Sequence, residues 1–178
     1  MIVLSKSLKD DVTDIPDFPV EGIIFHDITS VIQSSEGLRL AVSELINSVS
    51  DLEFDSIAGI ESRGFIFGSI LAEKLEKGFV LVRKKGKLPR KTISEEYSLE
   101  YGSAEIEIHT DAVKPGERVL LIDDLIATGG TVKAAARLIE RLGGEVAGAA
   151  FLIELSGLNG REALRDYQVR SVITYDGK

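Results

Sequence analysis

The stretch VLLIDDLIATGGT, Val119–Thr131, is the most informative part of the chain for its fold. Its first four residues are apolar, as in a buried strand, and two carboxylates, Asp123 and Asp124, follow them. In open α/β sheets, ligands bind at the carboxyl ends of the strands. After a short turn, TGGT opens the next helix. The stretch therefore predicts a strand, a turn and a helix with a ligand site between them.

The start of that helix predicts a phosphate site. The first N–H groups of a helix have no partner within the helix, and the helix dipole favours an anion there. The glycines let a phosphate approach the backbone, and the threonines add hydroxyl donors. Each part alone would fit a strand-end turn or a threonine-capped helix start. Together, a carboxylate pair and a phosphate site one turn apart match a ribose 5-phosphate.

Periodic segments on both sides of this stretch predict an α/β fold, an open and mostly parallel sheet with helices on both faces. Apolar residues recur at helical spacing over 38–49, 65–75 and 132–142. Expected strands are Ser56–Ile60, Phe79–Arg83, Ala104–His109, Arg118–Ile122, Val146–Ile153 and Val169–Tyr175. Since no repeat or low-complexity linker interrupts them, residues 1–178 are expected to form a single domain.

Composition excludes several classes of function. The net charge of −8 and the pI near 4.9 argue against a nucleic-acid partner, because such partners demand a basic face. No stretch reaches the roughly 20 apolar residues that a membrane-spanning helix needs. The chain has no cysteine, which removes disulfides and thiolate metal sites. A cytoplasmic location is expected, and a small anionic substrate remains possible, because a local cluster of donors is enough to bind it.

The segment between Arg83 and Tyr101 does not fit the α/β pattern. It is polar, charged and long for a connection in a compact domain. We expect either a functional loop or a disordered insert. Its basic residues are concentrated in an otherwise acidic chain, although charge runs are usually solvated faces.

Val119–Thr131 resembles the binding motif for 5-phosphoribosyl-1-pyrophosphate (PRPP) in type I phosphoribosyltransferases. FPVEGIIFHDIT (Phe18–Thr29), GIESRGF (Gly59–Phe65), GKLPRKT and YSLEYG resemble the adenine phosphoribosyltransferase family in the same order. The resemblance implies transfer of the phosphoribosyl group of PRPP to adenine N9, giving AMP and pyrophosphate. It also implies a homodimer and a Mg²⁺ cofactor that is held mainly by the substrate, without a dedicated protein cage.

The resemblance assigns roles residue by residue. Adenine is expected at Ile24, Phe25 and His26, in a base-binding segment over residues 15–30. The ribose and its 5-phosphate are expected at Asp123, Asp124, Ala127, Thr128, Gly129, Gly130 and Thr131. Pyrophosphate is expected at Glu61, Ser62, Arg63, Lys84, Lys87 and Tyr101, under a flexible hood loop over residues 84–102. Glu100 is expected to be the catalytic carboxylate that assists proton movement on the purine.

Three details refine these assignments. Phe25 is expected to stack on the purine while the backbone of Ile24 and His26 reads its edge. His26 departs from the family, which commonly has arginine there. The turn at Glu61-Ser62 is expected to contain a strained peptide, with a cis bond as one form.

Simpler interpretations and other functions stay open at this point. Phe25 could be a core aromatic, Arg63 a turn arginine paired with Glu61, and Glu100 a solvent-facing strand acid. A different base, such as hypoxanthine, xanthine or orotate, could use the same donor site. A DNA-binding regulator that senses PRPP is a second alternative, against which the acidic pI argues. The missing glycine patterns weaken P-loop and dinucleotide-binding alternatives.

Overall fold

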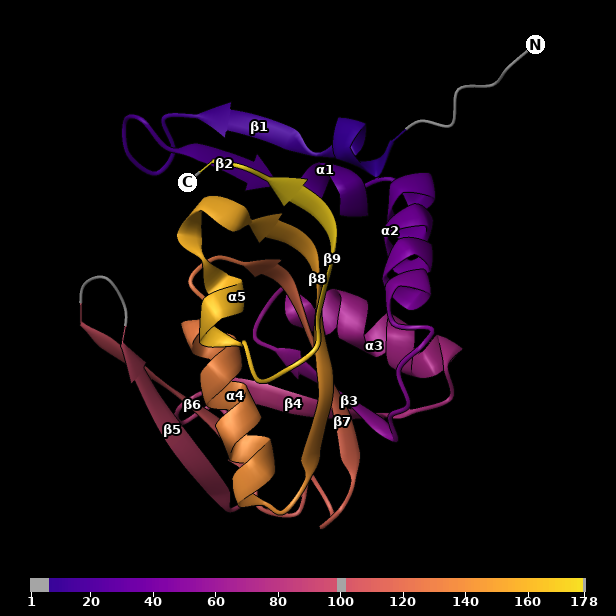
Figure 1. Cartoon of the computed structure of the whole chain (residues 1–178), viewed down its shortest axis with the longest axis vertical. Helices are drawn as coiled ribbons and strands as arrows, with labels where there is room; N and C mark the ends of the chain where they lie inside the picture. The colour runs from indigo at the N-terminus through magenta and orange to yellow at the C-terminus, as the bar shows by residue number, and fades with distance from the viewer. Residues whose placement is uncertain (1–6, 99–101, 178) are drawn as a thin grey trace.

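A seven-stranded sheet forms the centre of the molecule (Figure 1). This computed structural model describes residues 7–98 and 102–177. The strands of the sheet are β3 (Ser56–Ile60), β4 (Gly78–Lys84), β5 (Thr92–Ser98), β6 (Ser103–His109), β7 (Arg118–Ile126), β8 (Glu145–Leu155) and β9 (Val169–Tyr175). Their order is β5-β6-β4-β3-β7-β8-β9, in which β4, β3, β7, β8 and β9 run parallel. The edge strands β6 and β5 are antiparallel to their neighbours.

Helices cover both faces of this sheet (Figure 1). One face carries α2 (Ser35–Ser48) and α3 (Gly64–Lys74), and the other carries α4 (Gly130–Arg141) with the short α5 (Gly160–Ala163). The predicted fold class is therefore confirmed. Within the described residues, no helix is both long and apolar enough to cross a membrane.

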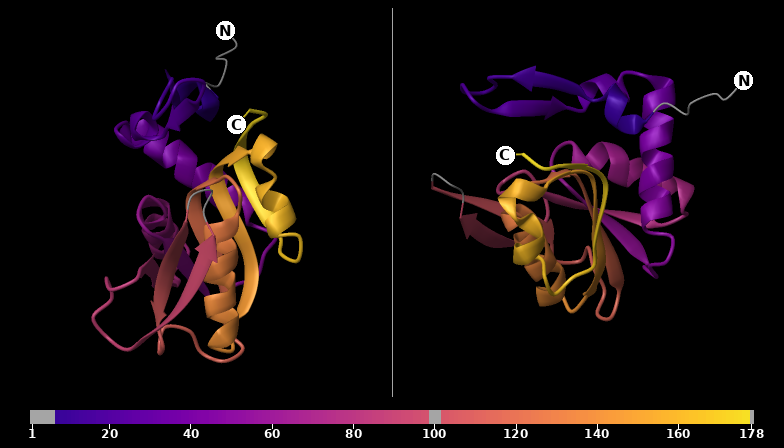
Figure 2. Two further views of the ribbon diagram at one scale, coloured as in Figure 1. Left: turned by 90° about the vertical axis from the view of Figure 1, so that its left-hand side faces the viewer. Right: turned by 45° about the horizontal axis from the view of Figure 1, so that its top comes forward.

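A small hairpin lies apart from the main sheet. It consists of β1 (Thr13–Pro16) and β2 (Ile24–Asp27), preceded by the 3-10 turn η1 (Leu8–Asp11) and followed by the short helix α1 (Thr29–Ile32). Figures 1 and 2 show the hairpin beside the end of the sheet where β8 and β9 finish. A second 3-10 turn, η2 (Ser156–Leu158), connects β8 to α5. The hairpin thus brings the base-binding segment to the carboxyl edge of the sheet.

Strand β7 shows why the apolar run at its start is continuous. Val119 and Leu121 pack toward α4, whereas Leu120 and Ile122 pack toward α2 and α3. Successive side chains of a strand point to opposite faces, and both faces of this sheet are covered by helices. The two packed layers fix β7 at the centre of the sheet.

Two local features differ from the expectation. The strand predicted over Arg118–Ile122 continues to Ile126, so both carboxylates of the motif lie within it. The segment after Lys84, expected to be irregular, contains β5, which pairs with β6 from Thr92 to Ser98. The sequence of β5, TISEEYS, alternates only weakly between apolar and polar residues, and its overall polarity hid this strand pattern. The flexibility expected of residues 84–102 stays a prediction.

Candidate active site

A pocket lies where β3 and β7 end and α4 begins. Its volume is about 280 Å³, and three parts of the chain line it: Ile60 to Arg63, Tyr97, and Asp123 to Val132. We call it the phosphate pocket, because the predicted ribose-phosphate residues Asp123, Asp124 and Ala127–Thr131 are all among its lining residues. The predicted pyrophosphate residues Glu61, Ser62 and Arg63 join them there.

Ala127–Thr131, the phosphate loop, owes its shape to a glycine. Gly129 precedes the first residue of α4 with φ of 79°, a left-handed conformation that residues with a side chain rarely adopt. A Cβ atom at Gly129 would lie 2.7 Å from the carbonyl oxygen of Gly160, closer than real contacts allow. The loop therefore needs glycine here for conformation and for space, while α4 presents its first N–H groups toward the pocket.

Both carboxylates of the motif are engaged. Asp124 is 6% exposed, and its Oδ2 accepts a hydrogen bond from Arg63 Nε at 2.5 Å. Asp123 Oδ1 accepts from the backbone N–H of Asp124 at 2.8 Å. Burial raises the pKa of Asp123 well above its usual range, and the negative charge of Asp124 raises it further, although Arg63 opposes both effects. Asp124 is thus the carboxylate that pairs with Arg63.

The turn after β3 has the expected unusual peptide. The bond between Glu61 and Ser62 is cis. The carboxylate of Glu61 accepts from Arg83 Nε at 3.1 Å and from the backbone N–H of Lys84 at 2.9 Å. Burial alone would raise the pKa of Glu61, but these hydrogen bonds lower it below its usual value. The alternative pairing of Arg63 with Glu61 is not formed, because each has another partner.

A second pocket, the base pocket, opens beside the hairpin. Its volume is about 540 Å³, and its lining is mostly apolar: Pro19, Val20, Ile23, Ile24, Phe25, His26, Arg63, Leu125, Leu155 and Leu158. All three predicted adenine residues are among them. Arg63 and Leu125 also line the phosphate pocket, so the two pockets meet at these side chains. Phe25 lies edge-on to Phe18, with ring centroids 5.2 Å apart.

The side chain of His26 is held by two neighbours. It is 8% exposed and stacks on Tyr175 of β9, with ring centroids 3.5 Å apart and planes at 16°. Its Nδ1 lies 2.6 Å from Asp14 Oδ1, at which distance an imidazole N–H donates to a carboxylate. The ring therefore joins the hairpin to the end of the sheet.

The hood reaches the phosphate pocket through β5. A Cβ atom at Gly130 would lie 3.6 Å from the carbonyl oxygen of Ser98 and 3.7 Å from the Tyr97 ring. The next residues of the chain, which include Glu100 and Tyr101, lie outside the described residues. Lys84 and Lys87 do not line the pocket.

Glu107 holds the turn that carries Lys87. Glu107 is buried, and its Oε1 accepts from the backbone N–H groups of Lys87 and Leu88, each at 2.9 Å. Burial alone would raise its pKa, but these hydrogen bonds lower it. The turn of the hood is therefore anchored by a buried carboxylate.

Sequence reasoning assigned no role to several lining residues, among them Leu125, Tyr97, Leu155 and Leu158. Leu125 follows the carboxylate pair, and strand alternation through Ile126 would have directed it toward the pocket. Tyr97 lay in a segment not predicted to be a strand. Leu155 and Leu158 carry no local signal, because only the crossing of β8 beside the hairpin brings them to the base pocket.

The pockets offer oxygen donors without a preformed metal cage. Within the described residues, no cluster of three or more histidine, aspartate or glutamate side chains is arranged to hold a metal ion. The carboxylates that line the phosphate pocket are those of Glu61, Asp123 and Asp124. Mg²⁺ commonly binds one or two carboxylates together with substrate phosphates and water, and these donors suit that mode.

Comparisons with known proteins agree with this geometry. The model of the phosphoribosyl transferase domain family matches residues 29–176. The adenine phosphoribosyltransferase of Agathobacter rectalis is 60% identical over 173 residues, which cover 97% of this chain and 99% of that protein. The crystal structure of adenine phosphoribosyltransferase from Thermoanaerobacter pseudethanolicus has a TM-score of 0.92 and 48% identity, covering 94% of this chain and 98% of that one.

A further structure contains ligands. It is the Saccharomyces cerevisiae adenine phosphoribosyltransferase in complex with adenine and an imino-altritol bisphosphate. Its TM-score is 0.87 at 38% identity, covering 93% of this chain and 96% of that chain. The similarity to these enzymes spans both pockets.

Proposed function

Since this chain belongs to the adenine phosphoribosyltransferase family, we propose that its two joined pockets hold the two substrates of that reaction. The enzyme transfers the 5-phosphoribosyl group of PRPP to adenine N9 and forms AMP and pyrophosphate. One observation carries the assignment of the pockets: Arg63 and Leu125 line both of them, so a base and a ribosyl donor can meet there.

The 5-phosphate of PRPP binds the phosphate loop in this proposal. Backbone N–H groups at the start of α4 and the hydroxyls of Thr128 and Thr131 donate to its oxygens. Asp123 and Asp124 accept hydrogen bonds from the ribose hydroxyls. The location supports this, since these residues line one pocket and the Asp124 carboxylate is held in place by Arg63.

Pyrophosphate lies at the turn of Glu61, Ser62 and Arg63. The arginine fork and the backbone donors of the cis turn suit phosphate oxygens. Glu61 acts through its neighbours, since its carboxylate is bound to Arg83 and to the backbone of Lys84. Lys84 and Lys87 reach the pyrophosphate from the hood, and Tyr101 orders the closed loop.

Adenine binds in the base pocket with Phe25 stacked on its face. The backbone of Ile24 and His26 reads its edge, and Leu125 contacts it from β7. The mostly apolar lining supports this, because a flat heteroaromatic base gains from burial and stacking. The His26 side chain is occupied by Asp14 and Tyr175, which supports recognition through the backbone.

Catalysis requires stabilisation of the leaving group and removal of water. The anomeric carbon gains positive charge as pyrophosphate departs, so the cationic side chain of Arg63 and the hood stabilise the developing negative charge. When bound, Mg²⁺ would be held mainly by PRPP oxygens and water and would supply positive charge at the pyrophosphate. Closure of the hood excludes solvent, and Glu100 assists proton movement on the purine. We also propose a homodimer and a cytoplasmic location, and the support for both is the family resemblance.

A pyrophosphate-release assay tests this proposal. The enzyme is given PRPP and Mg²⁺ with adenine, hypoxanthine, xanthine or orotate in turn, and the reaction is repeated with EDTA. We expect release with adenine alone and its loss with EDTA. Release with another base at a comparable kcat/KM would contradict the assigned base pocket, and unchanged rates in EDTA would contradict the Mg²⁺ requirement.

A further inference from the structure

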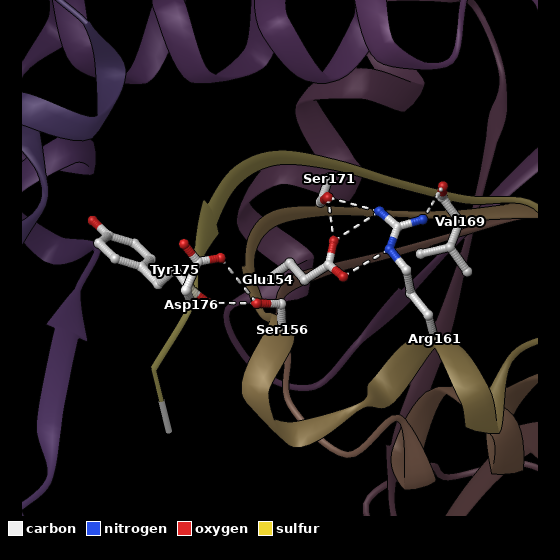
Figure 3. Close-up of polar contacts among 7 residues, drawn as sticks. All are labelled: Glu154, Ser156, Arg161, Val169, Ser171, Tyr175 and Asp176. Carbon is white, nitrogen blue, oxygen red and sulfur yellow. Dashed lines mark hydrogen bonds and ion pairs between the residues drawn. The ribbon is translucent and has the colours of Figure 1, made fainter.

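An ion-pair cluster links α5 to β8 and β9 (Figure 3): its carboxylate, Glu154, is buried, whereas the Arg161 side chain is 48% exposed. Glu154, in β8, is 7% exposed, and both its carboxylate oxygens accept hydrogen bonds from Arg161 of α5, from Nε and Nη2, each at 2.7 Å. Ser171 of β9 donates to Glu154 Oε2 at 2.5 Å, and Arg161 Nη1 donates to the carbonyl of Val169 at 3.0 Å. The cluster therefore fastens α5 to two strands of the sheet.

The first residue of α5, Gly160, packs tightly against the phosphate loop and the end of β7. A Cβ atom at Gly160 would lie 2.4 Å from the carbonyl oxygen of Ala127, and one at Gly129 would lie 2.7 Å from the carbonyl oxygen of Gly160. The side chain of Ile126 would also lie 2.7 Å from a Cβ atom at Gly160, and Ala163 Cβ would lie 3.1 Å from one at Gly129, so the two surfaces are in close contact. A shift of α5 must therefore shift the loop as well.

Helix α5 cannot hold this position by itself. It has four residues, and its N-cap, Asn159, makes no side-chain capping hydrogen bond. Isolated helices of this length are unstable in water, so tertiary contacts must fix it. Arg161, the second residue of α5, makes the ion pair with Glu154 that supplies such a contact. Its hydrogen bonds lower the pKa of Glu154 and so keep the carboxylate charged.

We propose that Arg161, held by Glu154 and Ser171, is a positioning residue that sets the phosphate loop for the 5-phosphate of the ribosyl donor. This rests on the proposed location of that phosphate at Ala127–Thr131. The base pocket has a separate support, because Ser156, between its lining residues Leu155 and Leu158, donates to the carbonyl of Tyr175 at 3.2 Å (Figure 3). Loss of Arg161 thus weakens phosphate binding selectively.

The chain offers a matched control at the other end of the sheet. Arg118 also donates to both oxygens of one carboxylate, Asp55, at 3.2 Å from Nε and 3.0 Å from Nη2. Arg118 begins β7 and lies about 20 Å along the strand from Asp124, since a strand rises about 3.3 Å per residue. Arg118→Met removes a bidentate arginine–carboxylate pair, together with the contact of Arg118 with Glu53, without touching either pocket; its carboxylates are more exposed than Glu154.

Calorimetric titration of the unreacted enzyme with ribose 5-phosphate and, separately, with adenine tests the inference. We expect Arg161→Met to raise the Kd for ribose 5-phosphate about tenfold, because small misplacements of binding groups have effects of at least this size. The Kd for adenine should stay within about twofold, and Arg161→Lys should restore part of the affinity. Arg118→Met should leave both affinities unchanged.

Arg161→Met alone leaves the buried Glu154 carboxylate without its partner, which could itself disturb the fold, and a second variant avoids this. Glu154→Gln/Arg161→Met leaves no unpaired buried charge, so it should fold and still bind ribose 5-phosphate about tenfold more weakly. Equal weakening of both ligands, or a lower Tm with unchanged affinities, would overturn the inference. Thr131→Val tests the site itself: normal ribose 5-phosphate binding by this variant would refute the proposed phosphate site, and weak binding by Thr131→Val with normal binding by Arg161→Met would refute only the role of Arg161.

Discussion

The phosphate pocket takes most of its lining from the single stretch Asp123 to Val132, whereas the base pocket takes its lining from the β1–β2 hairpin, β7 and the β8–η2 segment. The first therefore depends on backbone groups and two carboxylates that local sequence places together. The second depends on side chains that only the tertiary fold assembles. A change in the phosphate pocket should therefore affect binding of the ribosyl donor. A change in the base pocket should affect binding of the base alone.

The largest effect is expected from loss of the predicted catalytic carboxylate. Glu100→Leu should lower kcat by about 10²–10⁴-fold, because general acid–base assistance is worth that range. Steady-state kinetics with both substrates measure it, and circular dichroism checks that the fold is kept. A variant with the parental kcat would remove Glu100 from the mechanism.

Asp124→Asn separates the pockets most directly. It should raise the KM for PRPP about 100-fold, because two charge-assisted hydrogen bonds of about 1.5 kcal/mol each are lost. Adenine binding to the free enzyme, measured by calorimetry, should persist, since Asp124 does not line the base pocket. If PRPP binds this variant normally, the ribose assignment is wrong.

Phe25→Ala is the converse change. We expect the KM for adenine to rise about 30-fold, since stacking of a base on an aromatic side chain is worth about 1–3 kcal/mol. The Kd for ribose 5-phosphate should not change. An equal rise in both constants would mean that Phe25 supports the hairpin as a core aromatic and does not contact the base.

His26→Arg should have a smaller effect. Arginine can also stack on Tyr175 and pair with Asp14, because its planar guanidinium suits both an aromatic face and a carboxylate. The kcat/KM for adenine should change by less than about tenfold, or about 1.4 kcal/mol. A collapse of activity, or a new preference for hypoxanthine, would show that the histidine side chain reads or activates the base.

The smallest effect concerns the acid stability of the support behind the phosphate loop. Hydrogen bonds from Arg161 lower the pKa of Glu154 below its ordinary value of 4.5. As the pH falls, the unfolded chain takes up the proton before the folded protein does. This contribution to stability is therefore present above about pH 4.5 and is lost as the pH falls through the lower pKa of the folded state. The free energy of unfolding, measured with urea, should fall between pH 6 and pH 3.5 by slightly less in Glu154→Gln than in the parent protein. The difference should be below about 1.4 kcal/mol, the equivalent of one pKa unit. An equal loss in both proteins would contradict the coupling.

Local sequence was sufficient where function depends on neighbours in the chain. The carboxylate pair and the glycines at 129 and 130 lie in one stretch, and the backbone conformation of a strand followed by a helix brings them into one pocket. Buried strands were also predictable, because helices on both faces require continuous apolar runs such as that of β7. Strand β5 was missed because its polar edge position carries no such run.

Contiguous residues were sufficient to predict the α/β architecture, the phosphate loop and the family resemblance. The pairing of Arg63 with Asp124, 61 positions away, and the place of Leu155 and Leu158 in the base pocket follow from how the chain folds. The same holds for Glu154, Arg161 and Ser171, which are ordinary polar residues in the sequence. Contacts between strands and helices depend on how the sheet is ordered and how its layers pack, and no local pattern encodes that order.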